Sequence, residues 1–239
     1  MRARFKKDYR STRAILVLEC PWELDQHDSN RTSVLPFVEG VAKYAGDTEV
    51  YHANFYDQGS FEAALKCLAR SRADNTLVYI AAHGHIREIA GIELNLIISK
   101  IGDYSRDCNI TGLMLGSCFV GQNTATIEAS ITGTSLRWCA GYGSECEWLA
   151  GTMIDCSVMA SMLELDCQDL ANRKLIVKQL AFALSPFSKT YVIGNDYREN
   201  AVSLENSITF VVRPSGQGNR AKTETIEVMD AYKEFQKYD

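Results

Sequence analysis

Two chemically reactive side chains each follow an apolar segment of strand length. Residues 76–82 (TLVYIAA) lead directly into His83, and residues 110–115 (ITGLML) lead through Gly116 into Cys118. If the two segments are neighbouring parallel strands, about 4.8 Å apart, the side chains just past their carboxyl ends meet at one edge of the sheet. An imidazole in that position can take the proton of a thiol, and the thiolate can then attack a carbonyl carbon.

Glycines beside these two residues fit the same chemistry. Acyl transfer needs preorganised donors for the oxyanion, and the backbone N–H groups of Gly84 and Cys118 are the candidates. A side chain at position 84 would keep the carbonyl oxygen away from the backbone. Gly116 and Gly121 permit the sharp turn that exposes Cys118 before the next helix, whose N-terminal dipole is expected to lower the thiol pKa.

The elements that position these residues alternate between strands and helices. The pattern predicts strands at 14–20, 48–52, 76–82, 110–115, 136–142, 190–193 and 208–212. It predicts helices at 34–44, from an N-cap at Ser60, and at 96–104, 122–132, 148–165, 174–184 and 224–238. A loop at 22–33 and a small hairpin at 87–95, beside the site, complete the order. Such alternation predicts a three-layer α/β/α sandwich with a mainly parallel central sheet.

Length and composition indicate one soluble globular domain over residues 1–239. Hydrophobic residues make up 46% of the chain and charged residues 23%, as in ordinary globular proteins. A net charge of -5 gives no general attraction to nucleic acid or to an anionic membrane. The basic arm at residues 1–13 is interpreted as a solvated tail. We find no segment with the roughly 20 apolar residues of a membrane span and no apolar signal core, so the expected location is cytoplasmic.

Two further features of the chain have ordinary interpretations. The eight cysteines form no C-x-x-C pair, which favours reduced thiols over disulfides or a metal site. Residues 213–222 (RPSGQGNRAK) form a flexible segment before the C-terminal helix at 224–238. That segment is either a self-processing site or a simple loop, and we favour the loop.

The two motifs resemble those of the caspase-like cysteine peptidases, which include caspases, metacaspases, legumains, gingipains, separases and CHAT-domain proteases. The shared pattern is an apolar strand before His-Gly and a following strand before Gly-Ser-Cys-x-x-Gly, here VYIAAHGH and GLMLGSCFVG. The order of elements from residue 14 to about residue 193 also matches the fold that the resemblance implies. It implies that His83 is the general acid/base, Cys118 the nucleophile and Gly84 an oxyanion donor. His85 is secondary, because the imidazole of the family directly precedes glycine.

The resemblance leaves the substrate preference open. Metacaspases that cut after Arg or Lys carry an acid two residues before the nucleophile and caspases carry Gln, whereas this chain has Gly116. Residues 138–148 resemble the wall of the family's substrate pocket. There, Glu145 and Glu147 would favour a basic side chain, unless they are simply solvated acids. A small or apolar side chain beside Trp138 is an equal contender.

The sequence therefore predicts a cysteine endopeptidase, a hydrolase that cleaves protein or peptide substrates through a Cys118–His83 dyad and a thioacyl intermediate. No metal or other cofactor is needed. Transpeptidation begins with the same step and stays possible. The resemblance further implies a regulated processing or signalling protease with an activating or regulatory protein partner. An extended peptide would pair with the sheet edge or with the hairpin at 87–95.

Three other functional classes fit less well. A catalytically silent caspase-fold interaction module is the main alternative, although an inactive copy has no chemical reason to hold both motifs. A zinc site from His83, His85 and a cysteine lacks a fourth ligand. A flavodoxin-like nucleotide binder needs a glycine-rich loop after the first strand, where this chain has the segment ECPW at residues 19–22.

Overall fold

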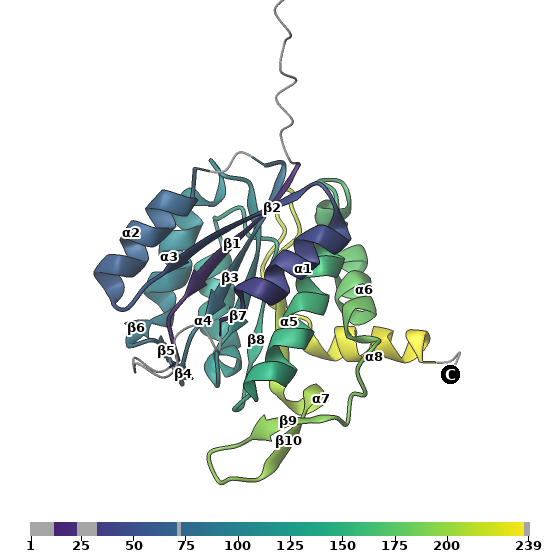
Figure 1. Cartoon of the computed structure of the whole chain (residues 1–239). Coiled ribbons are helices and arrows are strands. Elements are labelled where there is room, and N and C mark those ends of the chain that lie inside the picture. Colours follow the sequence, from purple (N-terminus) through teal and green to yellow (C-terminus); the bar gives the residue numbers. More distant parts are fainter. Residues whose placement is uncertain (1–11, 23–32, 71–72, 237–239) are drawn as a thin grey trace, which may run out of the picture.

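A seven-stranded sheet forms the centre of the protein (Figure 1). The computed structural model describes residues 12–22, 33–70 and 73–236. The sheet has the order β12-β11-β8-β7-β3-β1-β2. Its strands are β1 Arg13–Glu19, β2 Thr48–Asn54, β3 Asn75–Ala81, β7 Ile110–Gly116, β8 Trp138–Tyr142, β11 Ile208–Val212 and β12 Lys222–Thr223. From β8 to β2 all neighbours are parallel, whereas β11 is antiparallel to both of its neighbours, β8 and β12.

Helices cover both faces of this sheet. They are α1 Leu35–Ala45, α2 Gln58–Leu68, α3 Leu94–Ser105, α4 Thr124–Ile131, α5 Trp148–Met162, α6 Arg173–Leu184, α7 Leu204–Ser207 and α8 Thr225–Phe235, with short 3₁₀ turns η1 Val120–Gln122 and η2 Asp169–Ala171. Helices α2, α3 and α4 pack on one face, and α1, α5, α6 and α8 pack on the other (Figure 1). The predicted three-layer α/β/α sandwich with a mainly parallel sheet is confirmed.

The unbroken apolar runs of the central strands follow from burial on both faces. In β1, Ile15 and Val17 belong to the core on the α1 side, while Leu16 and Leu18 belong to the core on the α2 side. Strand β3 alternates in the same way. A strand that is covered on both faces does not alternate between polar and apolar residues. Its first exposed residue comes after the strand leaves the sheet. That position is the edge at which His83 follows β3.

Two small sheets lie outside the central one. Strands β4 Gly84–His85, β5 Glu88–Ile89 and β6 Ile92–Glu93 form an antiparallel meander where a hairpin was predicted. Strands β9 Val192–Asn195 and β10 Ala201–Ser203 form a hairpin that projects from the lower end of the molecule (Figure 1). The strand predicted at 190–193 is therefore displaced to 192–195. It stays out of the central sheet because β11 occupies the edge of β8.

The start of helix α2 differs from the prediction. Asp57, not Ser60, is the N-cap, and its side chain accepts a hydrogen bond of 2.7 Å from the Ser60 N–H. The Ser60 hydroxyl in turn accepts a hydrogen bond of 3.0 Å from the Asp57 N–H, which completes a capping box. Both residue types are good N-caps, and a cap at Asp57 lets each of the two side chains pair with the backbone N–H of the other residue.

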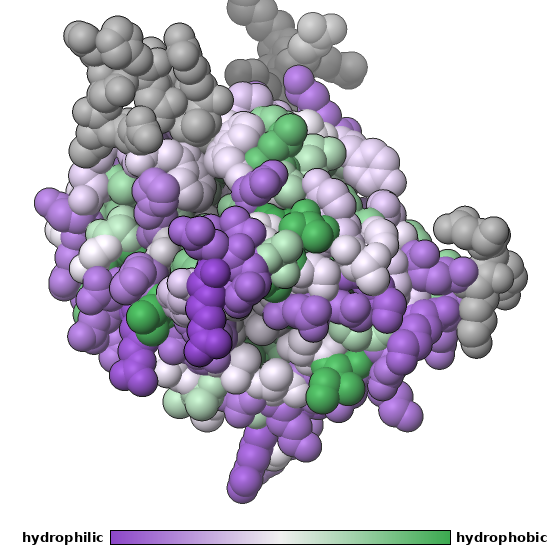
Figure 2. Space-filling model, turned by 90° about the horizontal axis from the view of Figure 1, so that it is seen from below, coloured by the Kyte–Doolittle hydropathy of each residue, from purple (hydrophilic) through white to green (hydrophobic). Residues whose placement is uncertain are grey.

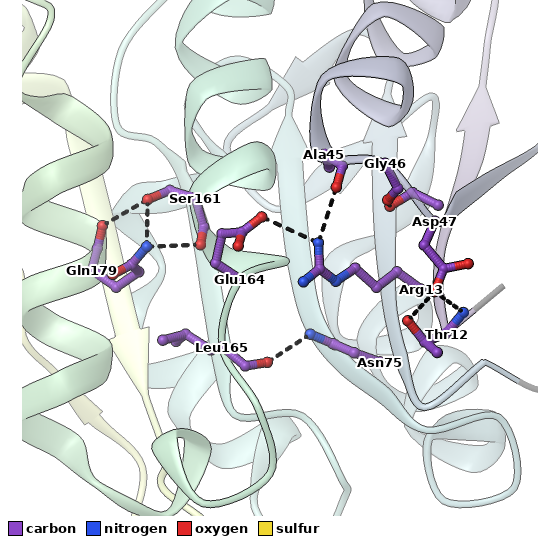
Figure 3. A network of polar contacts seen from close by, with 11 residues as sticks. Thr12, Arg13, Ala45, Gly46, Asp47, Asn75, Ser161, Glu164, Leu165 and Gln179 are labelled. Carbon is purple, nitrogen blue, oxygen red and sulfur yellow. Dashed lines mark hydrogen bonds and ion pairs between the residues drawn. The ribbon is translucent and has the colours of Figure 1, made fainter.

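Polar contacts fix the end of the sheet opposite His83 and Cys118. Arg13 Nη1 donates hydrogen bonds to Glu164 Oε1, at 3.1 Å, and to the Ala45 carbonyl, at 3.3 Å (Figure 3). The buried Asn75 side chain donates to the Leu165 carbonyl at 3.2 Å. These contacts tie the amino ends of β1 and β3 to α1 and to the segment that follows α5. These contacts limit movement of β1 and β3, whose carboxyl ends lead to the site.

Gly112 in β7 provides a test of the packing. A Cβ atom at this position would lie 2.2 Å from Cε2 of Trp138, which is fully buried. We expect Gly112→Ala to lower the free energy of unfolding by about 1–3 kcal/mol through overpacking, measured by urea denaturation. Gly40→Ala is the control, because Gly40 lies in α1 with open space around it and gains up to about 1 kcal/mol from helix propensity. Equal effects of the two changes would contradict this packing.

Candidate active site

His83 and Cys118 leave the sheet at the same edge. Strands β3 and β7 are parallel neighbours in which Ala81 pairs with Gly116, and His83 and Cys118 each lie two residues further on. The described surface seen from below, which includes this edge, is mostly hydrophilic with separate hydrophobic side chains (Figure 2). The two predicted motifs are thus brought together by strand register.

The backbone of Gly84 packs directly against that of Cys118. A Cβ atom at position 84 would lie 2.3 Å from the Cys118 carbonyl oxygen and 2.9 Å from the Cys118 nitrogen. Any side chain there would force the two motifs apart. Among the described residues, no other residue accepts a hydrogen bond from the Cys118 N–H. The arrangement therefore leaves this N–H available as an oxyanion donor.

The imidazole of His83 is oriented by Trp22, which the sequence analysis did not single out. His83 Nε2 lies 3.0 Å from the Trp22 carbonyl oxygen, and the two rings meet edge to face at 4.5 Å between centroids. A carbonyl oxygen only accepts, so Nε2 carries the proton and Nδ1 of the neutral ring is the basic nitrogen. The position of β1 could have indicated Trp22. Strand β1 is the parallel neighbour of β3 and Glu19 pairs with Ala81, so the residues after Glu19 run beside His83.

The Cys118 thiol is half-buried, and its surroundings make it harder to ionise. Burial raises the pKa of Cys118, the Cys146 N–H opposes this by donating to Cys118 Sγ at 3.4 Å, and Glu145 adds a further increase. No hydrogen bond joins His83 to Cys118. The predicted lowering of the Cys118 pKa by a helix dipole is not found, because the chain first turns through η1 and α4 begins only at Thr124.

A small pocket opens beside Cys118. Four aromatic residues contribute to its walls, and the lining comes from several elements: Trp22, Val34, Tyr79, Gly116, Ser117, Cys118, Tyr142, Cys146, Glu147, Trp148, Gly151, Thr152 and Asp155. Three polar atoms of lining residues are buried without a hydrogen-bond partner among the described residues, namely Trp22 Nε1, Trp148 Nε1 and Ser117 Oγ. Because buried polar groups are normally paired, these atoms are available to a bound molecule.

A buried carboxyl group lies in this pocket. Asp155 of α5 is 1% exposed and accepts hydrogen bonds from the Tyr79 hydroxyl, at 2.7 Å, and the Tyr142 hydroxyl, at 2.6 Å. Burial raises the pKa of Asp155 to about 7, against the opposing effect of the two hydroxyls. Asp155 Oδ2 lies 2.7 Å from the position that a Cβ atom of residue 116 would occupy. An acid from α5 thus stands next to the position two residues before Cys118.

The sequence analysis missed Asp155, and it placed one other residue wrongly. The available signal was a single acid within the apolar run of α5. Trp138 was expected in the pocket wall, but it lies at the amino end of β8, paired with Gly112, and is fully buried in the core. The prediction for Trp138 is wrong because the other end of β8, at Tyr142, reaches the pocket.

The remaining predicted residues occupy the surroundings of the site. Glu147 lines the pocket, and the exposed Glu145 is held through its backbone N–H, which donates to the Asn195 carbonyl at 2.9 Å. His85 is exposed on β4, opposite Glu88. Within the described ranges, no group of three or more His, Cys, Asp or Glu side chains is arranged to hold a metal ion. Of the described helices, none combines the length and hydrophobicity that crossing a bilayer requires.

Comparison with known proteins shows a likeness in structure but none in sequence. No family model matches the chain, and no curated protein matches it. Among solved structures, it is similar to iotapain, a secreted C11 cysteine protease from Bacteroides thetaiotaomicron, with 12% identity and a TM-score of 0.50. The match covers 85% of this chain and 66% of that one, just under two thirds. The chain has a caspase-like fold. At this identity the likeness establishes the fold and not the reaction, and it lends no support to the expected cytoplasmic location or to CHAT-domain membership.

Asp155 makes the stability of the protein depend on pH. Its pKa of about 7 in the folded state lies above the ordinary value of 3.8, so the unfolded chain loses this proton first as the pH rises. The free energy of unfolding therefore falls between about pH 4 and pH 7, by on the order of 4 kcal/mol from this group. Asp155→Asn removes that contribution. Between these pH values, the melting temperature of the variant, measured by calorimetry, should rise relative to that of the wild type. If the melting temperatures of the two proteins changed with pH in parallel, the raised pKa of Asp155 would be contradicted.

Proposed function

We propose that the protein is a cysteine endopeptidase with Cys118 as nucleophile and His83 as proton carrier. The observation that carries the proposal is the contact between the two motifs, in which Gly84 packs against the backbone of Cys118 at adjacent strand ends. The oriented imidazole and the available Cys118 N–H support the same chemistry. The fold shared with a C11 cysteine protease supports the reaction class.

The proposed reaction begins from a protonated Cys118 thiol. The raised pKa of Cys118 keeps the proton on sulfur in the free protein, so His83 Nδ1 acts as a general base when the peptide carbonyl is in place. The thiolate attacks the carbonyl carbon, and the N–H groups of Gly84 and Cys118 stabilise the oxyanion. His83 returns the proton to the leaving amine, which leaves a thioester on Cys118. Water, deprotonated by His83, then hydrolyses the thioester.

The pocket beside Cys118 favours a basic side chain on the acyl side of the cleaved bond. Asp155 has no ion-pair partner among the described residues, so an ammonium or guanidinium group would be its first counter-ion. The aromatic walls from Trp22 and Trp148 suit a cation as well. The exposed Glu147 adds negative charge at the pocket. Buried indole N–H groups are suitable donors to substrate carbonyl oxygens.

Two parts of the sequence-based prediction stay predictions. An activating or regulatory protein partner and a processing or signalling role rest on the family resemblance alone. The catalytically silent interaction module is the alternative to the peptidase. A wild-type protein that neither cleaves peptides nor forms an acyl intermediate would favour that alternative.

Peptide hydrolysis tests the dyad. With fluorogenic peptides that carry Lys or Arg before the cleaved bond, we expect Cys118→Ala to abolish turnover, and His83→Ala to lower kcat about 10²- to 10⁴-fold through loss of the general base. His85→Ala is the matched control, since His85 is an exposed histidine two residues away. It should keep kcat within about twofold of the wild type. If His85→Ala lost activity while His83→Ala stayed active, the proton carrier would be His85 and the proposed role of His83 would be wrong.

Substrate preference tests the role of Asp155. We expect Asp155→Asn to lower kcat/KM for Lys and Arg peptides about 10- to 100-fold relative to matched Gln and Leu peptides, through loss of the charged contact. Glu145→Gln is the control, because Glu145 is exposed and is not part of the pocket lining. An unchanged preference in Asp155→Asn together with a lost preference in Glu147→Gln would assign the selectivity to the exposed acid.

A further inference from the structure

Phe119, directly after the proposed nucleophile, has a backbone conformation that phenylalanine rarely adopts. Its φ angle is +63°, in the left-handed region. A bulky residue stays in that region only where the surrounding structure holds it there. The contacts of Phe119 therefore determine how the chain leaves Cys118.

Two contacts hold Phe119, and one of them is made by an exposed side chain. The Phe119 N–H donates to the Ser144 carbonyl at 3.0 Å. The Phe119 ring, 6% exposed, stacks on the ring of Tyr197 with centroids 3.9 Å apart and planes 14° from parallel. The Tyr197 hydroxyl also accepts a hydrogen bond of 2.9 Å from Gln122 Nε2. Tyr197 thus contacts the residue before the turn η1 and the last residue of that turn.

Tyr197 lies in the connection between β9 and β10, whose shape is fixed by local hydrogen bonds. The Asp196 carboxylate accepts from the Arg198 N–H at 2.7 Å and from the Asn200 N–H at 2.9 Å. Hydrogen bonds to an ionised carboxylate are strong, and those from Asn200 and Arg198 lower the pKa of Asp196. The tip of the hairpin is therefore a preorganised support for the Tyr197 ring.

The same hairpin also holds residues 145–147, the segment that contacts the Cys118 thiol. The Glu145 N–H donates to the Asn195 carbonyl at 2.9 Å, and the Glu147 N–H donates to the Ile193 carbonyl at 2.7 Å. Cys146, between these two residues, is the donor to Cys118 Sγ. Strand β9 and Tyr197 consequently each hold a segment that is next to the nucleophile.

We infer that Tyr197 is a positioning residue, which keeps Phe119 in its left-handed conformation and so aims Cys118 at the substrate carbonyl. The inference rests on the proposed peptidase function. Tyr197 is 54% exposed, so its ring is not needed to fill the core. It is not part of the pocket lining around Asp155 either. Loss of the ring should therefore impair the chemical step and leave substrate binding in place.

Kinetics of matched variants test the inference. In Tyr197→Ala we expect kcat to fall about tenfold with KM within about twofold of the wild type, since the contacts with Phe119 and Gln122 are lost while the pocket lining is unchanged. Tyr197→Phe keeps the ring and should restore most of kcat. Tyr191→Ala is the control, because Tyr191 is a comparably exposed aromatic residue, 47%, at the base of the same hairpin. A raised KM with unchanged kcat in Tyr197→Ala would overturn the inference and make Tyr197 a substrate contact.

Hydrogen exchange separates this inference from the peptidase proposal. The Phe119 amide should exchange at least about tenfold faster in Tyr197→Ala than in the wild type, as its bond to Ser144 opens more often, and it should be unchanged in Tyr191→Ala. Unchanged exchange in Tyr197→Ala would overturn the positioning role whatever the activity. A wild-type protein that does not cleave peptides would contradict the peptidase proposal instead. Hydrogen exchange of the Phe119 amide would then decide by itself whether Tyr197 holds the chain after Cys118 in place.

Discussion

The backbones of Gly84 and Cys118 touch at the edge of the sheet, and the position of the site depends on this contact. It requires that Ala81 of β3 pairs with Gly116 of β7, so that the residues after them advance side by side. The register of the two strands shifts near their start, where Thr76 pairs with Ile110 but Leu77 pairs with Gly112. Without this irregularity, Ala81 would pair one residue earlier on β7. A shift of one residue turns side chains to the opposite face, so the His83 and Cys118 motifs would no longer meet.

Burial makes both acidic groups of the site, Cys118 and Asp155, harder to ionise in the free protein. A thiolate at Cys118 and a carboxylate at Asp155 would be two anions in a poorly solvated region, and burial raises the pKa of both groups. In the proposed reaction a basic substrate side chain would neutralise Asp155. That contact would remove part of the cost of forming the thiolate nearby. Substrate binding and nucleophile activation would then favour each other without any change in fold.

The sequence predicted the features that follow from local pattern. Central strands such as β1 and β3 are apolar throughout because both faces are covered, and their alternation with helices specified the layers. The meeting of the His83 and Cys118 motifs at one sheet edge was also predicted, but the glycine at position 84 was explained by access of the substrate and not by its contact with Cys118. The helix start at Asp57 was missed because two good capping residues lie three positions apart.

Residues that reach the site from distant segments could not be predicted in the same way. Trp22 follows β1, Asp155 lies within α5, and Tyr197 lies in a hairpin outside the central sheet. Only tertiary packing brings these three residues to the surroundings of His83 and Cys118. Trp138 shows the converse error. It was assigned to the pocket by its neighbourhood in sequence, yet four residues of strand separate it from Tyr142, about 13 Å along β8.

The central claim is that His83 and Cys118 act as one catalytic pair, and covalent trapping tests it most directly. The purified wild type and the His83→Ala variant would be treated with a peptidyl electrophile that carries a basic residue next to its reactive group, and the adducts located by mass spectrometry. The account predicts a single adduct on Cys118 that forms about 10²-fold more slowly in His83→Ala. Adducts spread over the eight cysteines, or a rate at Cys118 that does not depend on His83, would contradict it.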